Sequence, residues 1–326
     1  MNIFITRAIP DAGLKALKAT GHHLDIYEQD RIIPRAELLR RVRGCDALLS
    51  LLTDQIDDTV MQAAGPQLKV IANYAVGFDN VDLKAARQHK IVVTNTPAPE
   101  VSETVAEHTF ALMLALAHRL VEADAYARAK KYQGWSPTLL MGTDVHGKTL
   151  GIIGTGRIGA TVVRHAVGGF GMRCLYHDHH RQPDLEKTFR ARAVSLETLL
   201  AQSDFVSVHV PLLPATRHLI STDEFSLMKK TAFLINTARG PIVDEKALLR
   251  ALKTKRIAGA ALDVFECEPA LDCDLTDKLE LKSFPNVILT PHTASATIEA
   301  RQAMSQLAAD NILAVLSGKP ALTPAT

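Results

Sequence analysis

Cysteine is scarce in this chain of 326 residues, and the four cysteines show no metal-binding or redox spacing. Cys45, Cys174, Cys267 and Cys273 form no Cys-x-x-Cys pair, so we expect neither a zinc site nor a disulfide framework. Unpaired cysteines are typical of proteins in a reducing compartment. The sequence therefore predicts a cytoplasmic protein.

An excess of charge of one sign is also missing, because 37 Lys and Arg face 35 Asp and Glu. This balance gives no field that would attract nucleic acid or an anionic membrane surface. The longest apolar helical run, Thr109 to Ala117, is too short to span a bilayer, and the N-terminal residues lack the regions of a signal peptide. We therefore expect a globular protein with neither nucleic-acid nor membrane partners. Its length and its 47% hydrophobic content fit two domains.

A glycine-rich segment in mid-sequence is the most informative feature that is present. Leu150-Gly-Ile-Ile-Gly-Thr-Gly-Arg-Ile-Gly159 runs from an apolar strand into a helical pattern, the context of a dinucleotide-binding fingerprint. The next apolar strand ends at Asp178, where a carboxylate can accept hydrogen bonds from ribose hydroxyls. We therefore predict a dinucleotide site in which the pyrophosphate lies at the helix N-terminus. The residues predicted to surround the cofactor here are Gly154, Gly156, Arg157, Ile158, Gly159 and Asp178.

Short apolar segments alternate with amphipathic helical segments in both halves of the chain, which predicts parallel sheets covered on both faces. The strands expected in the first half are Ile3–Thr6, Leu24–Tyr27, Ala47–Leu51, Lys69–Asn73 and Ile91–Thr94. Those expected in the second half are Leu150–Ile153, Met172–His177, Phe205–Val210, Ala232–Asn236, Ala258–Val264 and Val287–Thr290. One long helical segment, Val101 to about Lys131, separates the two series. The fold class is thus α/β, with two doubly wound parallel-sheet domains: a flavodoxin-like substrate domain and a Rossmann dinucleotide-binding domain.

The Pro-rich segment Thr96–Pro99 predicts a domain boundary. We assign residues 1–99 and 292–326 to a discontinuous substrate domain, because the closing helix has no strand of its own to pair with. Residues 100–291 form the dinucleotide-binding domain, with a dimerisation arm at about 101–147. The active site is expected in the cleft between the domains.

Three late strands are followed by polar segments, and ligands bind at the carboxyl ends of strands in such sheets. These segments are Asn236–Gly240, Asp263–Pro269 and Thr290–Ser295. Arg239 can bind a carboxylate through its two-pronged guanidinium, and His292 can exchange a proton near neutral pH. Glu268 can orient the imidazole and favour its charged form. Each residue also has an ordinary structural interpretation as a loop or strand-end residue.

In its motifs the chain resembles the D-2-hydroxyacid dehydrogenase family throughout its length, and most closely the glyoxylate/hydroxypyruvate reductase branch. The motifs that carry the resemblance are Asn73–Asp82, Val105–Leu114, Gly134–Pro137, Gly147–Gly159, His209–Leu212, the Arg239 segment, Asp263–Pro269 and Pro291-His292. The resemblance implies reduction of a small 2-oxo acid, glyoxylate or hydroxypyruvate, by hydride transfer from NAD(P)H. It implies that Arg239 binds the substrate carboxylate and that His292, paired with Glu268, donates the proton.

The resemblance also implies further contacts. Backbone N–H groups of Val76 and Gly77 would hold the carboxylate from the first domain, while Leu52 and Trp135 would shape the substrate pocket. Trp135 would reach it from the partner subunit of a homodimer. Asp263 would meet the nicotinamide carboxamide. The other residues that would line the cofactor channel are Thr104, Val210, Pro211, Thr216, Thr237 and Ala238.

The choice of cofactor and the presence of a metal are less strongly indicated. Asp178 favours NAD because its carboxylate would repel a 2′-phosphate, but His179, His180 and Arg181 follow it, so NADP stays open. Adjacent residues at a strand end rarely converge on one ion, so we predict no metal site there. Asn73 and Asp79 are interpreted as loop-shaping residues.

Other functions on this scaffold remain as alternatives. Formate dehydrogenases have glutamine in place of the catalytic glutamate, which Glu268 argues against. Phosphoglycerate dehydrogenases often add a regulatory domain beyond the closing helix, whereas this sequence stops at Thr326, so we do not expect that function. A dehydrogenase for a larger 2-oxo acid, or for phosphite, stays open. So does a non-enzymatic NAD-sensing interaction protein like the C-terminal-binding corepressors, which keep the same three polar residues.

Overall fold

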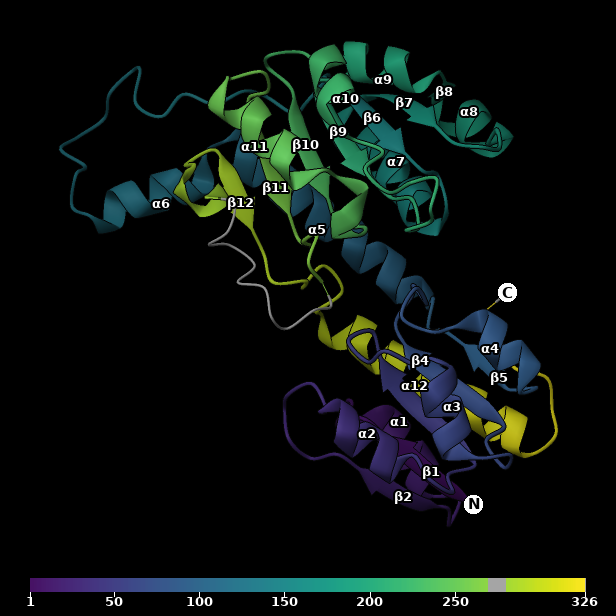
Figure 1. Ribbon diagram of the computed structural model, residues 1–326. Coiled ribbons are helices and arrows are strands. Elements are labelled where there is room, and N and C mark those ends of the chain that lie inside the picture. Colours follow the sequence, from purple (N-terminus) through teal and green to yellow (C-terminus); the bar gives the residue numbers. More distant parts are fainter. Residues whose placement is uncertain (269–279, 326) are drawn as a thin grey trace. The chain divides into compact units, whose positions relative to one another are not determined.

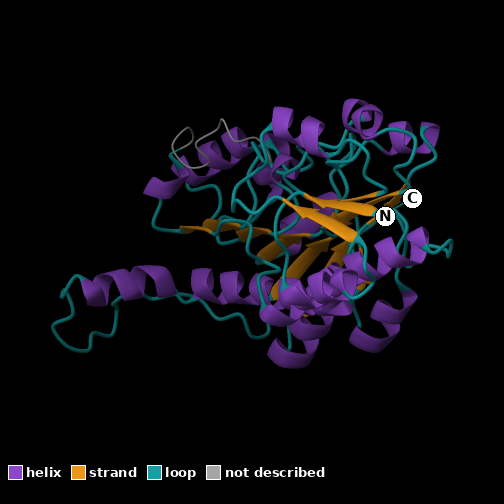
Figure 2. Ribbon diagram, turned by 90° about the horizontal axis from the view of Figure 1, so that it is seen from below, coloured by secondary structure: helices purple, strands orange, loops and turns teal. Residues whose placement is uncertain are grey.

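The computed structural model describes residues 1–268 and 280–325, which form two compact units (Figure 1). Unit 1 consists of Met1–Val101 and Ala296–Thr326, and unit 2 of Ser102–Ser295. Each unit has its own parallel sheet, and Figure 2 shows helices around the strands. The two parallel α/β sheets confirm the predicted fold class.

The sheet of unit 1 has five parallel strands in the order β2-β1-β3-β4-β5. This is the flavodoxin-like order, in which the chain reverses direction across the sheet beside the first strand. Apolar residues such as Ile3, Leu48 and Ile71 are buried because helices cover both faces. The strands are β1 (Asn2–Ile5), β2 (His23–Ile26), β3 (Ala47–Leu51), β4 (Val70–Tyr74) and β5 (Val92–Thr94).

The helices of unit 1 begin where the sequence supplies caps. The Asp57 and Asp82 carboxylates accept N–H groups from the first turns of α3 and α4, which satisfies donors that the helix itself leaves unpaired. The C-terminal helix packs on α1 and β4, and the Tyr74 hydroxyl donates to the Arg301 carbonyl at 2.8 Å. The helices are α1 (Asp11–Lys18), α2 (Arg35–Arg41), α3 (Asp58–Ala64), α4 (Leu83–Gln88) and α12 (Ile298–Leu316).

The sheet of unit 2 has seven parallel strands in the order β12-β11-β10-β9-β6-β7-β8. The chain starts at β6, moves outward through β7 and β8, and returns to β9 on the other side of β6. The carboxyl ends of β6 and β9 therefore flank the point where ligands bind in doubly wound sheets. The strands are β6 (Thr149–Ile153), β7 (Arg173–His177), β8 (Arg192–Ala193), β9 (Phe205–Val208), β10 (Phe233–Asn236), β11 (Gly259–Leu262) and β12 (Val287–Leu289).

Two buried apolar clusters cover the faces of this sheet. Val206 and Leu234 belong to one cluster, and Ile152 and Ile235 belong to the other. The helices are α5 (Pro99–Ala117), α6 (Leu120–Arg128), α7 (Arg157–Phe170), α8 (Pro183–Phe189), α9 (Leu196–Gln202), α10 (Thr222–Leu227) and α11 (Glu245–Lys253), with 3-10 turns η1 (Gly240–Ile242) and η2 (Leu281–Ser283). None of the helices in the described ranges is both long and apolar enough to cross a membrane.

The predicted single helix from Val101 to Lys131 is wrong, because the structure has two helices, α5 and α6. Arg119 between them has φ 53°, a left-handed conformation that a helix cannot continue through. The Thr143 N–H donates to the Ala117 carbonyl at 2.9 Å and satisfies the end of α5. In Figure 1, α6 and the loop after it project beyond the sheet of unit 2.

Candidate active site

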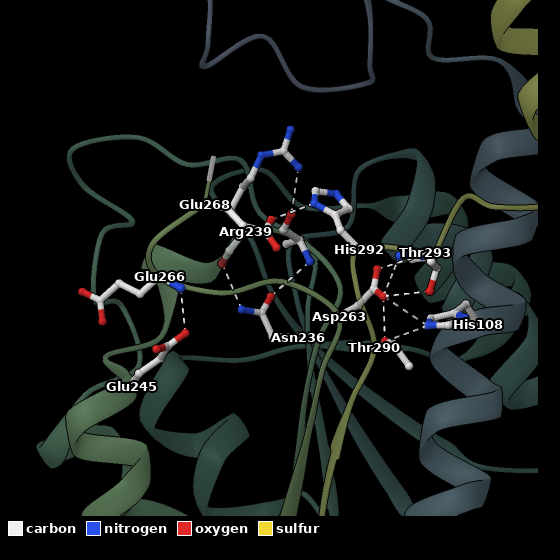
Figure 3. A network of polar contacts seen from close by, with 12 residues as sticks. His108, Asn236, Arg239, Glu245, Asp263, Glu266, Glu268, Thr290, His292 and Thr293 are labelled. Atoms are coloured by element: carbon white, nitrogen blue, oxygen red, sulfur yellow. Dashed lines mark hydrogen bonds and ion pairs between the residues drawn. The ribbon is translucent and has the colours of Figure 1, made fainter. Parts of the chain in front are cut away.

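The loops that follow β10, β11 and β12 carry Arg239, Glu268 and His292 to the carboxyl edge of the unit 2 sheet (Figure 3). The first loop is held by Asn236, whose amide donates to the Arg239 carbonyl at 2.9 Å and accepts the Ala238 N–H at 3.0 Å. The Arg239 guanidinium also donates to the Ala238 carbonyl at 2.8 Å. These bonds fix the turn that carries the cation.

His292 and Glu268 form a pair across two loops. The Nδ1 atom of His292 lies 2.7 Å from Oε2 of Glu268, and both side chains are only partly exposed. A carboxylate on Nδ1 orients the ring and stabilises its protonated form. The opposite nitrogen, Nε2, is then the one placed to exchange a proton with a ligand. The structure thus brings together the two residues that the sequence predicts as an acid–base pair.

Asp263 organises the loop that carries His292. Its side chain is fully buried, and its oxygens accept the Thr290 hydroxyl at 2.6 Å and the Thr293 and Ala294 N–H groups at 2.8 Å each. Burial alone would raise the pKa of this carboxyl, but the hydrogen bonds from His108, Thr290 and the two N–H groups outweigh it and lower the pKa. The carboxylate is therefore already well supplied with donors from its own unit.

His108 on α5 is a residue that the sequence reasoning missed. Its Nε2 atom lies 3.5 Å from Oδ1 of Asp263 and 3.3 Å from the Thr290 hydroxyl. It therefore ties the helix to the loops after β11 and β12. The motif that contains His108 is conspicuous in the sequence, but nothing in its spacing indicates that Asp263 lies beside it.

The glycine-rich turn between β6 and α7 has the shape that a dinucleotide needs. A side chain on Gly159 would place its Cβ 2.0 Å from the Gly154 carbonyl, so only glycine allows α7 to begin so close to β6. A Cβ on Gly156 would meet no atom within 4 Å, so its surroundings are open. Arg157 and Ile158 begin the helix whose free N–H groups can receive phosphate.

Asp178 lies at the end of β7 and contacts the same turn. The Thr155 N–H and hydroxyl donate to its Oδ2 atom at 2.6 and 2.8 Å, and the His180 N–H donates to Oδ1 at 3.3 Å. Burial would raise the pKa of Asp178, but these bonds outweigh it and lower the pKa, which keeps the carboxylate charged. Thr155, which stands between the fingerprint glycines, was not predicted to hold this acid.

The other residues predicted to line the cofactor channel lie on several elements of unit 2. Val210 contacts the fingerprint turn, since its Cγ1 would be 2.7 Å from a Cβ on Gly154. The Thr216 hydroxyl donates to the Pro211 carbonyl at 2.6 Å, and the Thr237 hydroxyl lies 3.3 Å from that of Thr109. Thr104 is buried on α5, and Ala238 lies in the loop that carries Arg239.

The predicted substrate residues Leu52, Val76 and Gly77 belong to unit 1, in the loops after β3 and β4. Asn73 shapes the second loop, because its side-chain amide donates to the Gly77 carbonyl at 3.0 Å and to Asn80 Oδ1 at 2.9 Å. The Asn95 amide donates to the Val76 carbonyl at 2.6 Å. Trp135 lies in the arm of unit 2 and is 84% exposed.

A cavity of about 500 Å³ lies at the opposite, amino end of the unit 2 sheet. It is lined by the end of α5, the start of α6 and residues that precede strands, among them Lys148, Asp204 and Ala258. The cavity is therefore separate from the edge that carries Arg239 and His292.

The expectation that the cysteines are unpaired is wrong for Cys267, which is disulfide-bonded. Cys45 and Cys174 are free and buried. Cys273 lies outside the described residues. Within residues 1–268 and 280–325, no group of three His, Cys, Asp or Glu side chains could hold a metal ion.

Comparison with known proteins identifies the family. Residues 110–294 match the model of the D-isomer specific 2-hydroxyacid dehydrogenase family, NAD binding domain. The chain belongs to the D-2-hydroxyacid dehydrogenase family. It is 48% identical to a glyoxylate reductase from Korarchaeum cryptofilum over 97% of this chain and 93% of that protein.

Solved structures of similar fold support the assignment of the chain to this family. The TT0316 protein from Thermus thermophilus has a TM-score of 0.91 and 41% identity, and the match covers 100% of both chains. A D-lactate dehydrogenase from Aquifex aeolicus, solved with NAD and lactic acid, has a TM-score of 0.84 and 32% identity, covering 98% of this chain and 96% of that one. The family resemblance predicted from the motifs is confirmed.

Proposed function

We propose that this dehydrogenase reduces glyoxylate and hydroxypyruvate with NAD(P)H. The observation that carries the proposal is the meeting of Arg239 and the His292–Glu268 pair at the sheet edge that also holds the dinucleotide turn. A small 2-oxo acid presents a carboxylate to a cation and a keto oxygen to a proton donor. The similarity to glyoxylate reductases supports this substrate class.

In the proposed mechanism the chain supplies charge, orientation and a proton. The Arg239 guanidinium binds the substrate carboxylate and stabilises the negative charge that develops on the keto oxygen. A reduced nicotinamide, when bound, supplies the hydride that is transferred to C2 of the 2-oxo acid. Nε2 of protonated His292 gives its proton to the same oxygen, and the Glu268 carboxylate stabilises the imidazolium before transfer.

The residues at the carboxyl edge fit an NAD(P) cofactor. The Gly156 turn and the start of α7 would receive the pyrophosphate, and Asp178 would accept the ribose hydroxyls. Thr104, Val210, Pro211, Thr216, Thr237 and Ala238 would line the rest of the channel. We propose NAD over NADP because the Asp178 carboxylate is kept charged by Thr155 and would repel a 2′-phosphate. Asp263 would meet the nicotinamide carboxamide through Oδ2, which accepts the Ala294 N–H.

We propose that unit 1 is the substrate domain and unit 2, apart from its last residues, the dinucleotide-binding domain. The boundaries inferred from the sequence, 1–99 with 292–326 and 100–291, differ from the compact units by only a few residues at each crossing. Val76 and Gly77 N–H groups would bind the substrate carboxylate, and Leu52 would limit the size of the substrate.

We further propose a homodimer formed by the arm. The helix α6 has no buried residue, and several large apolar side chains of the arm are exposed, an arrangement typical of an unfilled interface. These residues are Leu120, Val121, Tyr132, Trp135 and Met141. Val121 and Met141 also line the 500 Å³ cavity, so the apolar surface of the arm continues into it.

We retain the cytoplasm as the proposed location. The buried thiols of Cys45 and Cys174 fit a reducing compartment, whereas the disulfide at Cys267 does not.

The proposed function is tested by initial rates of absorbance loss at 340 nm. NADH and NADPH are supplied separately with glyoxylate, hydroxypyruvate, pyruvate or phenylpyruvate. We expect turnover of the first two acids, with NADH preferred. Arg239→Ala is expected to raise KM and lower kcat, while Arg173→Ala, an exposed arginine at the amino end of β7, serves as the matched control.

Each contrary result has a defined meaning. Selective turnover of phenylpyruvate would keep the mechanism and replace the substrate. Unchanged kinetics of Arg239→Ala would remove Arg239 from the mechanism. Tight binding of NADH without turnover of any acid would favour the NAD-sensing protein.

A further inference from the structure

Glu245 is a buried acid that the proposed mechanism does not use. It is the first residue of α11 and is only 4% exposed. Glu245 follows the cap residue Asp244 in the first turn of the helix. An exposed acid is common at this position because it interacts favourably with the helix dipole, but Glu245 is buried. Buried carboxyl groups are costly and therefore require a specific partner.

The partner of Glu245 is the backbone of the turn that carries Glu268. The Glu266 N–H donates to Oε1 of Glu245 at 2.6 Å, and the Glu268 N–H closes the same turn on the Phe265 carbonyl at 3.2 Å. Figure 3 shows Glu245 rising from its helix toward this turn, beneath the side of the site that holds Glu268. The bond thus fastens the turn to the helix two residues before the carboxylate that contacts His292.

The same turn is in backbone contact with the segment that carries Arg239. A Cβ on Gly240 would lie 1.8 Å from the Phe265 carbonyl and 2.4 Å from the Glu266 nitrogen, so no side chain fits between the segments. The Glu266 side chain is held in turn by His218 at 2.6 Å, and the His218 N–H donates to the Pro241 carbonyl at 2.8 Å. Glu245 therefore supports the junction between the Arg239 loop and the Glu268 turn.

We propose that Glu245 is a positioning residue for the reaction: its carboxyl anchors the 265–268 turn and thereby keeps Glu268 in contact with His292. The proposal rests on the proposed acid–base role of that pair. We assign Glu245 no contact of its own with the substrate or the cofactor. Its effect passes through the Glu266 N–H to the Glu268 carboxylate.

The protonation of Glu245 fits this role. Burial raises the pKa of the carboxyl to about 7, the Glu266 N–H opposes the rise, and the Glu266 and Glu268 carboxylates add to it. Near neutral pH the group is then only partly ionised, which limits its repulsion of Glu268. The Glu266 N–H requires only an acceptor oxygen, and the side-chain amide of glutamine would supply one in a group of similar shape to the carboxyl.

Two substitutions separate anchoring from charge. Glu245→Ala removes the acceptor and should lower kcat for glyoxylate on the order of tenfold to a hundredfold, because small misplacements of reacting groups have effects of this size. The dissociation constant for NADH should stay unchanged. Glu245→Gln keeps an acceptor and should retain kcat within about threefold. Glu197→Ala, an exposed acid in the first turn of α9, is the matched control for loss of a helix-terminal charge.

Hydrogen exchange of the peptide that contains the Glu266 amide gives a readout that does not depend on turnover. We expect faster exchange in Glu245→Ala than in the wild type, and wild-type protection in Glu245→Gln. Wild-type kcat and protection in a folded Glu245→Ala variant would overturn the proposal. Equal loss of kcat in the Ala and Gln variants would also overturn it, because the acceptor would then not be what matters. A wild-type protein that turns over no 2-oxo acid would instead refute the proposed function, while altered exchange would still locate the anchor.

Discussion

His292 adopts a backbone conformation that non-glycine residues seldom adopt, with φ 53°. Its N–H donates to the Asp263 carbonyl at 2.8 Å, and the Asp263 carboxylate accepts the next two N–H groups along the chain. Such a conformation persists only when the surrounding bonds determine it. Asp263 therefore orients the loop so that the His292 imidazole faces Glu268. His108 on α5 in turn helps to hold the Asp263 carboxylate in place.

At the residue scale, the charge of Glu268 is expected to matter more than its volume. Glu268→Gln keeps the size of the side chain and removes the negative charge from Nδ1 of His292. Because the proposed reduction takes its proton from His292, which this carboxylate contacts, the variant should turn over glyoxylate more slowly than the wild type. The measurement is kcat and KM for glyoxylate at one fixed pH near neutrality, with NADH saturating.

Glu280→Gln is the control for that measurement, since Glu280 pairs with Lys253 on the exposed surface of the same unit. A Glu268→Gln variant with the wild-type kcat would show that the charge of this carboxylate does not assist the reaction.

The sequence alone predicts the acid–base pair but not its supports. Arg239, Glu268 and His292 each follow a strand, and strand ends converge at one edge, so their proximity can be inferred from order alone. His108 and Glu245 act on residues far away along the chain, through contacts that no local pattern encodes. The contact between Thr155 and Asp178 was missed for a different reason. The fingerprint specifies only the glycines that let the turn approach the phosphates, and it specifies no side chain at the position of Thr155.

At the scale of elements, His209, which directly follows β9, should make the stability of unit 2 decrease in acid. Burial lowers the pKa of His209 to about 4, and its Nε2 lies 2.8 Å from the Ser207 hydroxyl. The unfolded chain takes up this proton near pH 6.5, but the folded chain takes it up only near pH 4. Stability from this residue is therefore complete above about pH 6.5 and is lost as the pH falls toward 4.

His209→Gln removes that linkage. In the absence of cofactor, Tm of the wild type should fall over this pH window, and Tm of the variant should fall less. His146→Gln, at an exposed position of the same unit, should behave as the wild type does. Parallel Tm curves for His209→Gln and the wild type would contradict the prediction.

Elements could be predicted wherever burial imposes a pattern. The central strands are continuous apolar runs because both faces are covered, and their predicted positions agree with the structure to within one or two residues at most ends. The edge strand β8 was missed because its two residues, Arg192 and Ala193, are exposed and carry no such pattern. The break between α5 and α6 was missed because Arg119 is an ordinary helix former, and only its conformation ends the helix.

At the scale of the whole molecule, the strands of both sheets are largely buried, whereas α6 and the loop after it leave large apolar side chains exposed. Leu120 and Val121 stay about half exposed within one chain, at 53% and 55%, and Trp135 is 84% exposed, so much of their apolar surface is left uncovered. Exposed apolar surface of this kind is typical of a protein–protein interface, where aromatic residues are enriched.

Trp135→Ala is expected to raise KM for glyoxylate on the order of tenfold while leaving the dissociation constant for NADH unchanged, because in the proposed homodimer this side chain enters the partner's substrate pocket. Tyr132→Ala removes a second exposed aromatic of the same arm and should leave KM unchanged. Sedimentation or light scattering of each variant over a dilution series reports the assembly separately. A wild-type protein that is monomeric and fully active at assay concentrations would exclude a contribution from a partner. If the Trp135→Ala variant is dimeric and has the wild-type KM, the proposed interface stands but Trp135 does not contribute to the substrate pocket, because removing its side chain leaves substrate binding unchanged.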